Sequence, residues 1–372
     1  MRITGQLLTS LIVIILSGTA LFAAVDLSEL KGSVLAVFQL FRAPWDRRGQ
    51  DKERPVFQKP HGFAYAKFEI AQDLPPTLRV GIFSETTSYH AWVRFSSDTP
   101  GTPGDQAKNT IGLAIKLLGA NSGGDQPSQD FLLQNHPAFF TDNSKELEAL
   151  FKGTLKQENP AREAQVQENL DAMDRDVDTY LDGNPWVMQK PVPSILSSKY
   201  WSAVPYKFGP QKFAKYFLEP RLRLDGTSSS TDPNYLKKDL AARLGSATTH
   251  CFDLYIQVTD DNDETPVELA SKVWDEKKTP GVRIGTLMLP GGQDTNPNPN
   301  VTTSLAFRPG NARAEHYPAG ELNLARTLIY KKMWELRREK HNLKLQDPVS
   351  VDVEDQEKNR IIQERLAAVS CN

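Results

Sequence analysis

Cysteine is scarce in this chain of 372 residues, which has two cysteines, Cys251 and Cys371. Two cysteines are too few for a disulfide-based scaffold, because they can form one bridge at most. The sequence contains no C-x-x-C or H-E-x-x-H motif, so these common metal-site patterns are excluded. Because Cys371 lies next to the end of the chain, we expect two unpaired thiols rather than a bridge.

An excess of charge of either sign is also missing. Lys and Arg number 44, and Asp and Glu number 46, which gives a formal net charge of -2. Nucleic-acid binders normally carry a basic excess, so we expect no nucleic-acid partner. The 25 prolines and 23 glycines argue against a coiled coil or a simple helical bundle, and 9% aromatic residues argue against disorder. The length allows one large domain or two smaller ones.

Charged residues are absent from Leu7 to Ala24, and Arg2 is the one positively charged side chain before this run. The pattern is typical of a signal peptide or a short N-terminal membrane anchor, so residues 1–24 are set apart from the fold. A buried N-terminal helix is the alternative. We expect an exported protein, either periplasmic or held on the membrane through residues 1–24, facing the periplasm or the extracellular side. Whether the leader is cleaved stays open.

Strand-like segments dominate the chain up to about residue 290, and helices dominate its last part. Apolar segments bounded by turn residues predict strands at 64–70, 91–96, 111–118, 252–258 and 284–289. Helices are predicted at 144–152, at 161–181 and from Gly320 onward. Strands followed by helices favour an α+β fold with an antiparallel sheet or barrel.

Four residues near the C-terminus share one face of the last predicted helix. Arg326, Tyr330, Met333 and Arg337 are spaced at i, i+4, i+7 and i+11. A guanidinium one turn from a phenol stabilises the phenolate and lowers the pKa of the tyrosine. Periodicity alone does not distinguish this arrangement from a solvated helix with ordinary basic residues, so both interpretations stay open.

A second polar stripe lies on the predicted strand near residue 93. His90, Trp92, Arg94 and Ser96 alternate onto one of its faces. They either line a polar pocket or form the solvated face of an amphipathic strand. Taken alone, the stripe does not decide between these two interpretations.

Seven short motifs, in this order along the chain, resemble the haem-dependent catalase family. They are His61-Gly62, Phe68-Glu69, Val93-Arg94-Phe95-Ser96, Gly112 to Lys116, Gln134 to Phe140, Ala306 to Asn311, and Arg326-x-x-x-Tyr330. The match covers about residues 55–340 and is most similar to small catalase-related members that keep only the core. It implies a catalase-like haem fold, an antiparallel β-barrel with surrounding helices, in one domain over residues 56–345. An N-terminal arm at 25–55 and a helical tail at 346–372 flank this domain.

The resemblance implies haem b as the cofactor, with Tyr330 as the axial ligand of its iron, since catalases are the standard example of tyrosine-ligated haem. Arg326 would keep the phenolate charged. Arg337 would contact the haem, and Arg94 would pair with a propionate, for which a bidentate guanidinium is well suited. By analogy with catalases, the chain could form a homo-oligomer in which the arm takes part.

On the distal side, the resemblance implies that His61 moves a proton between the two peroxide oxygens. Ser96 would orient the imidazole of His61 through a hydrogen bond. Asn135 is assigned as the distal amide, although a gap-free match places Gln134 there. The distal wall would be aromatic, formed by Phe139, Phe140 and, as a further candidate, Phe151.

Three positions depart from the catalase pattern. Gln58 stands three residues before His61, where larger catalases carry a propionate-binding arginine. Pro60 replaces the usual valine, and Ile111 replaces an arginine. These changes predict fewer charged haem contacts and a looser or reoriented haem.

The implied function is that of a haem-dependent, peroxide-cleaving oxidoreductase of the catalase or peroxidase type. Its substrate would be hydrogen peroxide or an organic hydroperoxide. Two alternatives stay open, namely a fatty-acid hydroperoxide isomerase or lyase and a non-catalytic haem-binding protein. The sequence does not identify the electron donor or the preferred peroxide.

Overall fold

The computed structural model describes most of the chain beyond its N-terminal segment. The described residues are 27–48, 54, 56–84, 88–98, 104–106, 110–120, 128–174, 192–222, 224, 231–296, 299–342, 351 and 356–371. The predicted leader at 1–24 lies outside them. Within the described part of the chain, we find no helix with the length and apolar character needed to cross a membrane.

The described residues form nine β-strands in one antiparallel sheet. The strands are β1 (Lys59–Ile70), β2 (Ser88–Ser97), β3 (Ile111–Leu118), β4 (Ser128–Gln134), β5 (Tyr200–Trp201), β6 (Tyr206–Phe208), β7 (Lys212–Pro220), β8 (His250–Thr259) and β9 (Val282–Leu289). All five predicted strand segments are confirmed, and they fall within β1, β2, β3, β8 and β9.

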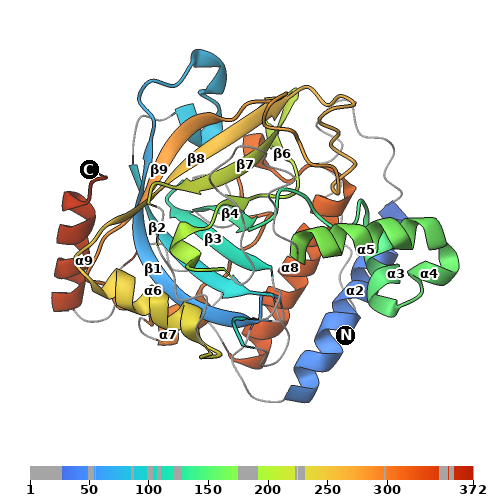
Figure 1. Cartoon of the computed structure of the whole chain (residues 1–372), viewed down its shortest axis with the longest axis horizontal. Coiled ribbons are helices and arrows are strands. Elements are labelled where there is room, and N and C mark those ends of the chain that lie inside the picture. The colour runs from blue at the N-terminus through green and yellow to red at the C-terminus, as the bar shows by residue number, and fades with distance from the viewer. Residues whose placement is uncertain are drawn as a thin grey trace.

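The sheet closes into a barrel of eight strands, and β6 extends it beyond β7 (Figure 1). One side of the closure is the pairing of β1 with β9, where Phe68 faces Leu287. The other side is β5, whose Trp201 pairs with Gln134 of β4 and with Phe217 of β7. The predicted α+β class with an antiparallel barrel is therefore confirmed.

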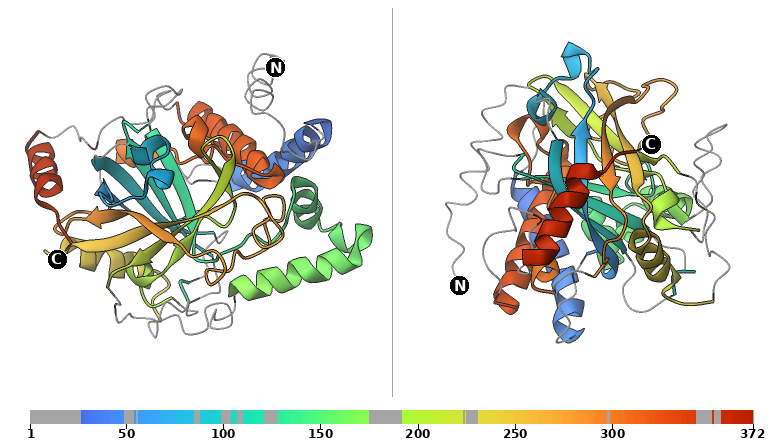
Figure 2. Two further views of the ribbon diagram at one scale, coloured as in Figure 1. Left: turned by 90° about the horizontal axis from the view of Figure 1, so that it is seen from above. Right: turned by 90° about the vertical axis from the view of Figure 1, so that its left-hand side faces the viewer.

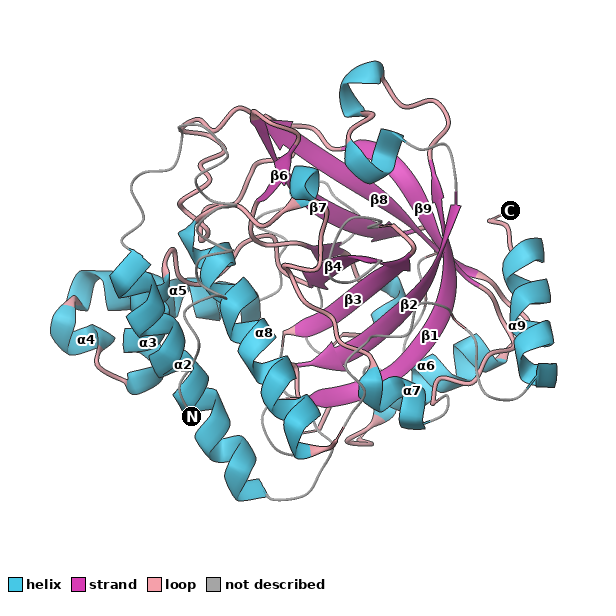
Figure 3. Cartoon of the chain, turned by 180° about the vertical axis from the view of Figure 1, so that it is seen from behind, coloured by secondary structure: helices cyan, strands magenta, loops and turns pink. Residues whose placement is uncertain are grey.

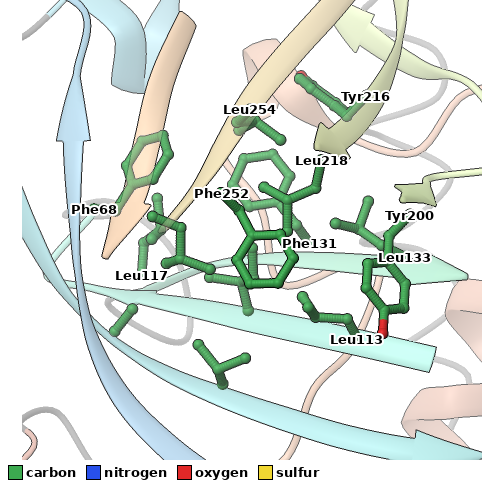
Figure 4. Packing of buried hydrophobic residues seen from close by; sticks show 14 of the residues in the cluster. Phe68, Leu113, Leu117, Phe131, Leu133, Tyr200, Tyr216, Leu218, Phe252 and Leu254 are labelled. Atoms are coloured by element: carbon green, nitrogen blue, oxygen red, sulfur yellow. The ribbon is translucent and has the colours of Figure 1, made fainter. Parts of the chain in front are cut away.

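Alternation along the strands separates the barrel interior from its outer face. On β1, Ala64, Ala66 and Phe68 belong to the main core, whereas Phe63 and Tyr65 join a second cluster outside the barrel. Each large apolar side chain buried in this way stabilises the fold by about 1.5–3 kcal/mol. Figure 4 shows the interior, which is filled by side chains that include Leu117, Phe131, Leu133, Phe252 and Leu254.

Helices cover the outside of the barrel. They are α2 (Leu27–Arg48), α3 (Ser144–Lys152), α4 (Leu155–Glu158), α5 (Pro160–Asp174), α6 (Tyr235–Gly245), α7 (Pro299–Ser304), α8 (Glu321–Lys340) and α9 (Gln356–Ala368). The predicted helix at 144–152 is confirmed as α3, and the one at 161–181 is confirmed up to Asp174, beyond which the residues lie outside the described part.

Residues of the predicted arm at 25–55 form α2, which packs against α3 and α8. Figure 3 shows α2 to α5 gathered at one end of the molecule and α9 at the other. Helix α8 begins directly after Gly320, whose φ of +79° is accessible to glycine without strain. A Cβ at this position would lie 2.7 Å from the carbonyl oxygen of Val267, so close packing also requires glycine. The side chain of Glu321 accepts a hydrogen bond from the backbone N–H of Ser144, which ties α8 to α3.

The C-terminal tail is docked on the barrel, so our prediction of two unpaired thiols is wrong. Cys251 of β8 and Cys371 form a disulfide, with their Cα atoms 6.1 Å apart. Helix α9 makes this pairing feasible because it lies beside β1 (Figure 2), where Ile362 and Leu366 join the outer cluster. Arg365 of α9 also donates a hydrogen bond to the hydroxyl of Tyr65, at 3.0 Å.

Candidate functional site

A cavity of about 760 Å³, counted with its open mouth, lies between α8 and strands β2, β3 and β4. Figure 3 shows α8 beside these strands. The described lining residues are Arg54, Val56, Phe57, Arg94, Ser96, Gly112, Leu113, Ala114, Leu132, Leu133, Gln134, Ser202, Ala306, Phe307, Arg308, Arg326, Tyr330, Met333, Trp334 and Arg337.

One face of α8 forms the helical wall of the cavity. Arg326, Tyr330, Met333 and Arg337 all line it, so the predicted helical face is confirmed, and Trp334 joins them. Arg326, Tyr330, Met333 and Arg337 recur at intervals of three or four, and Trp334 follows Tyr330 by four, which places all five on one side of an α-helix. Other residues of α8 also pack inward, because Ala325 and Ile329 belong to the main core and the helix contacts α2.

Arg326 is held beside Tyr330 by a short chain of hydrogen bonds. Its Nη1 donates to Oδ1 of Asn323 at 3.0 Å, and Nδ2 of Asn323 donates to the carbonyl of Pro205 at 2.7 Å. The guanidinium carbon lies 6.0 Å from the centroid of the Tyr330 ring. Burial raises the pKa of Tyr330 above its ordinary value, and the positive charge of Arg326 opposes this shift. A cation bound at the phenol oxygen would favour the phenolate further.

The strand wall carries a second buried arginine. Arg94 of β2 donates from Nη1 to Oγ of Ser96 at 2.9 Å and from Nη2 to the carbonyl of Phe57 at 2.6 Å. Its Nε is buried and has no hydrogen-bond partner. Burial, together with the charge of Arg337, lowers the pKa of Arg94 to about 9. An anion in the cavity would reverse both effects, so Arg94 is suited to bind a carboxylate.

Two further arginines line the cavity, and the sequence interpretation missed both. Arg54 donates to the carbonyls of Thr302 and Leu305 at 3.0 and 2.7 Å. The guanidinium of Arg308 stacks on the ring of Trp334, 4.3 Å from its centroid. The cavity therefore has five guanidinium groups, and its described lining contains no carboxylate. Of the three departures, Gln58 does not line the cavity, whereas Arg54 does, and the looser or reoriented haem stays a prediction.

Known structures with the same architecture are catalases. A fungal catalase matches with a TM-score of 0.57 at 17% identity, over 82% of this chain and 61% of its own. A bacterial catalase matches with a TM-score of 0.59 at 17% identity, over 85% of this chain and 64% of its own. Catalase A from Saccharomyces cerevisiae matches with a TM-score of 0.56 at 16% identity, over 82% of this chain and 64% of its own.

The chain has the catalase fold. It spans less than two thirds of the length of these three catalases, at 61%, 64% and 64%. No family model matches the sequence. No curated protein matches it either.

Within this catalase fold, His61 does not reach the cavity, contrary to the sequence prediction. It lies at an irregularity of β1 between Pro60 and Gly62, is fully buried, and is missing from the described lining residues. Its Nε2 lies 2.6 Å from Oγ of Ser97, not of Ser96. Ser96 lines the cavity, and successive residues of a strand point to opposite faces, so Ser97 and its histidine lie on the other side of β2.

The assignment of Ser96 as the partner of His61 is therefore wrong, and Ser96 accepts a hydrogen bond from Arg94 instead. The distal amide needs the same kind of correction. Asn135 is missing from the described lining residues. Its Oδ1 accepts a hydrogen bond from the backbone N–H of Ile111 at 2.8 Å. Gln134, which the gap-free match places at the amide position, lines the cavity.

The predicted aromatic wall lies behind the cavity rather than on it. Phe139 and Phe140 stack with their ring centroids 4.3 Å apart and are missing from the described lining residues. Phe139 still supports the site, because the guanidinium of Arg326 lies 5.5 Å from its centroid. Phe151 is exposed and packs against Phe41 of α2. Among the described residues, Phe57, Phe307, Tyr330 and Trp334 supply the aromatic lining.

Proposed function

We propose that this cavity binds haem b, with Tyr330 as the axial ligand of the iron. The observation that carries the proposal is that Tyr330 and Arg326 meet three further buried or half-buried arginines, Arg54, Arg94 and Arg337, in one apolar-walled cavity. A porphyrin supplies four nitrogen donors itself, so one protein ligand is sufficient, and its two propionates need cationic partners. The unpaired Nε of Arg94 fits a propionate at that position.

When bound, the haem supplies a ferric centre at which a peroxide O–O bond can be cleaved. The residues of the chain hold and tune it. Arg326 favours the charged form of Tyr330, and an anionic ligand stabilises the ferric state. Gln134 and Ser96 provide polar groups on the strand wall, whereas Leu132 and its neighbours keep the cavity apolar. We infer a peroxide-cleaving oxidoreductase acting on hydrogen peroxide or organic hydroperoxides.

One observation favours a second candidate, a haem-binding protein with little catalytic activity. His61, the expected proton shuttle, lies on the far face of β2 and pairs with Ser97. General acid–base catalysis contributes about 10²–10⁴-fold to such reactions, so its loss would slow hydrogen peroxide cleavage accordingly. A fatty-acid hydroperoxide isomerase or lyase stays an alternative within the first candidate.

A haem titration of the purified protein tests the proposal. We expect saturable binding and a high-spin ferric spectrum that is lost in Tyr330→Phe. Tyr255→Phe is the matched control, because Tyr255 stacks on Phe217 away from the cavity. Oxygen release from hydrogen peroxide, compared with turnover of a lipid hydroperoxide, then separates the candidate reactions. An unchanged spectrum in Tyr330→Phe would refute the ligand assignment.

Export from the cytoplasm is a further part of the proposal. Disulfides persist mainly in oxidising compartments, so the bridge between Cys251 and Cys371 supports an extracytoplasmic location. A homo-oligomer is proposed by analogy with catalases, and α2 lies within the predicted arm at 25–55. Size measurement in solution with multi-angle light scattering would test it.

A further inference from the structure

Arg54 and Phe57 occupy the cavity with the spacing that catalases use for an arginine and the distal histidine. Both residues line the cavity, and they are three positions apart. The sequence interpretation had placed this pair at Gln58 and His61, and neither of these residues lines the cavity. In the structure, the pair that lines the cavity therefore lies four residues closer to the N-terminus than the predicted pair. Its second member is a phenylalanine, where the resemblance predicts a histidine.

The backbone of Phe57 is held in an unusual conformation that aims its ring into the cavity. Its φ of +51° lies in the left-handed region, which costs a residue other than glycine about 1–2 kcal/mol. Hydrogen bonds hold it on both sides, since its N–H donates to Oδ1 of Asp98 at 3.3 Å and its carbonyl accepts from Arg94 at 2.6 Å. Such conformations persist where the surroundings fix them, often at functional sites.

The opposing strand is shaped to accept this ring. A Cβ added at Gly112 of β3 would lie 2.5 Å from Cε1 of Phe57, so a larger residue there would displace the phenyl group. The neighbouring Val56, Leu132 and Phe307 also line the cavity. Phe57 thus belongs to an apolar part of the cavity wall. The described lining residues include no histidine.

We propose that Phe57 is the distal residue of this site and makes it selective for organic hydroperoxides that carry an apolar group. The proposal rests on the proposed function, because it requires haem in the cavity. Hydrogen peroxide and organic hydroperoxides both give up a proton early in the reaction, and a phenyl ring cannot accept it, so the missing base slows both alike and selectivity comes from apolar contact. The same ring offers apolar surface to an alkyl or aryl group, which hydrogen peroxide lacks.

The first test uses cyanide as a probe of a base in the haem-loaded protein. Hydrogen cyanide must lose its proton when it binds ferric haem, so a base beside the iron accelerates its association. We expect Phe57→His to raise the association rate by about 10²-fold or more. Phe57→Ala is the control, and it should leave the rate low because it opens space without adding a base. Histidine is enriched among residues other than glycine with positive φ, so the backbone should tolerate it.

The second test compares substrates. We expect the wild type to prefer cumene hydroperoxide to hydrogen peroxide in kcat/KM, and Phe57→His to gain oxygen release from hydrogen peroxide. Phe57→Ala should lose about tenfold in kcat/KM for cumene hydroperoxide, the factor expected when contact with an aromatic ring is removed, with little change for hydrogen peroxide. This variant keeps the proposal testable if Phe57→His does not fold.

His61→Gln decides between the two assignments. We expect it to leave the cyanide association rate unchanged, because His61 lies beyond β2. A slower rate in His61→Gln, or no acceleration in a folded, haem-loaded Phe57→His, would overturn the proposal. If the wild type binds no haem, the proposed function fails first, and the haem titration reports this outcome separately.

Discussion

Asp130 of β4 holds the cavity segment Ala306–Asn311 against the barrel, and its replacement by asparagine is expected to destabilise the chain strongly. Its carboxylate is fully buried and pairs with the equally buried Lys116 at 2.8 and 2.9 Å. One carboxylate oxygen also accepts a hydrogen bond from the backbone N–H of Arg308 at 2.9 Å. The other accepts one from the side chain of Asn311 at 3.1 Å.

The magnitude follows from the burial of both charges. Asparagine keeps the size of the side chain and one oxygen acceptor, so the main change in Asp130→Asn is the loss of the negative charge. Removing one partner of a buried ion pair costs about 3–5 kcal/mol, because the other charge stays buried without compensation. In the double variant Lys116→Met, Asp130→Asn, both charges are gone. We expect its loss of stability to be smaller than the sum of the two single losses by an interaction energy of about 2–3 kcal/mol.

Urea unfolding of the wild type, the two single variants and the double variant measures this cycle. Additive losses would refute the reasoning, as would a loss below about 1 kcal/mol in Asp130→Asn. Asp130→Ala extends the test to the cavity, because it also removes the acceptor for the backbone of Arg308. We expect its haem affinity to fall about tenfold below that of Asp130→Asn, since leaving the backbone N–H of Arg308 without this acceptor costs about 1–3 kcal/mol.

Three further predictions concern the bridge, acid stability and the haem-binding arginine. The disulfide between Cys251 and Cys371 closes a loop of 120 residues, so reduction should lower the free energy of unfolding by up to about 5 kcal/mol. Urea unfolding with and without reductant measures this loss, and equal midpoints would contradict it. Burial lowers the pKa values of His61 and His316 to about 3 from 6.5, so the unfolded chain binds more protons and stability falls as pH drops from about 6.5 toward 3. At about pH 4.5, each of these two histidines should lower the free energy of unfolding by about 3 kcal/mol, as measured by urea unfolding. If His316→Gln loses as much stability in acid as the wild type, His316 is not a source of the acid sensitivity. Arg94→Met should weaken haem binding at least about tenfold in a spectroscopic titration, and an unchanged affinity would exclude Arg94 as a propionate partner.

The parts of the fold that sequence patterns predict are those with local periodicity. Strands β1, β2 and β3 alternate or run apolar over many residues, and α8 repeats its cavity-facing residues every three to four positions. Strand β5 was not predicted, because it has two residues and exists only through its pairing with β4 and β7. The disulfide was missed for a related reason, since only the docking of α9 brings Cys371 to Cys251.

The candidate site divides in the same way. Its helical half, Arg326 to Arg337, was predicted because one α-helical face carries it. The strand half was partly mistaken, because one irregularity of β1 at His61 separates neighbouring motifs onto different faces. The pair that we propose, Arg54 and Phe57, has the same spacing of three residues that the resemblance assigned to Gln58 and His61. A search for a histidine at this spacing misses the pair, because position 57 holds phenylalanine.

The distribution of charge in the cavity gives the proposed cofactor a role in stability as well as in chemistry. Five guanidinium groups line one apolar space, and the lowered pKa of Arg94 means that its protonation is less favourable there than in water. Two propionates and a phenolate at Tyr330 would supply negative charge among these arginines. A ligand that binds only the folded chain stabilises it by about 4 kcal/mol at a thousand times its Kd. Haem should therefore raise the unfolding midpoint of the wild type more than that of a variant lacking Arg94, because part of the stabilisation comes from relieving repulsion between that residue and Arg337.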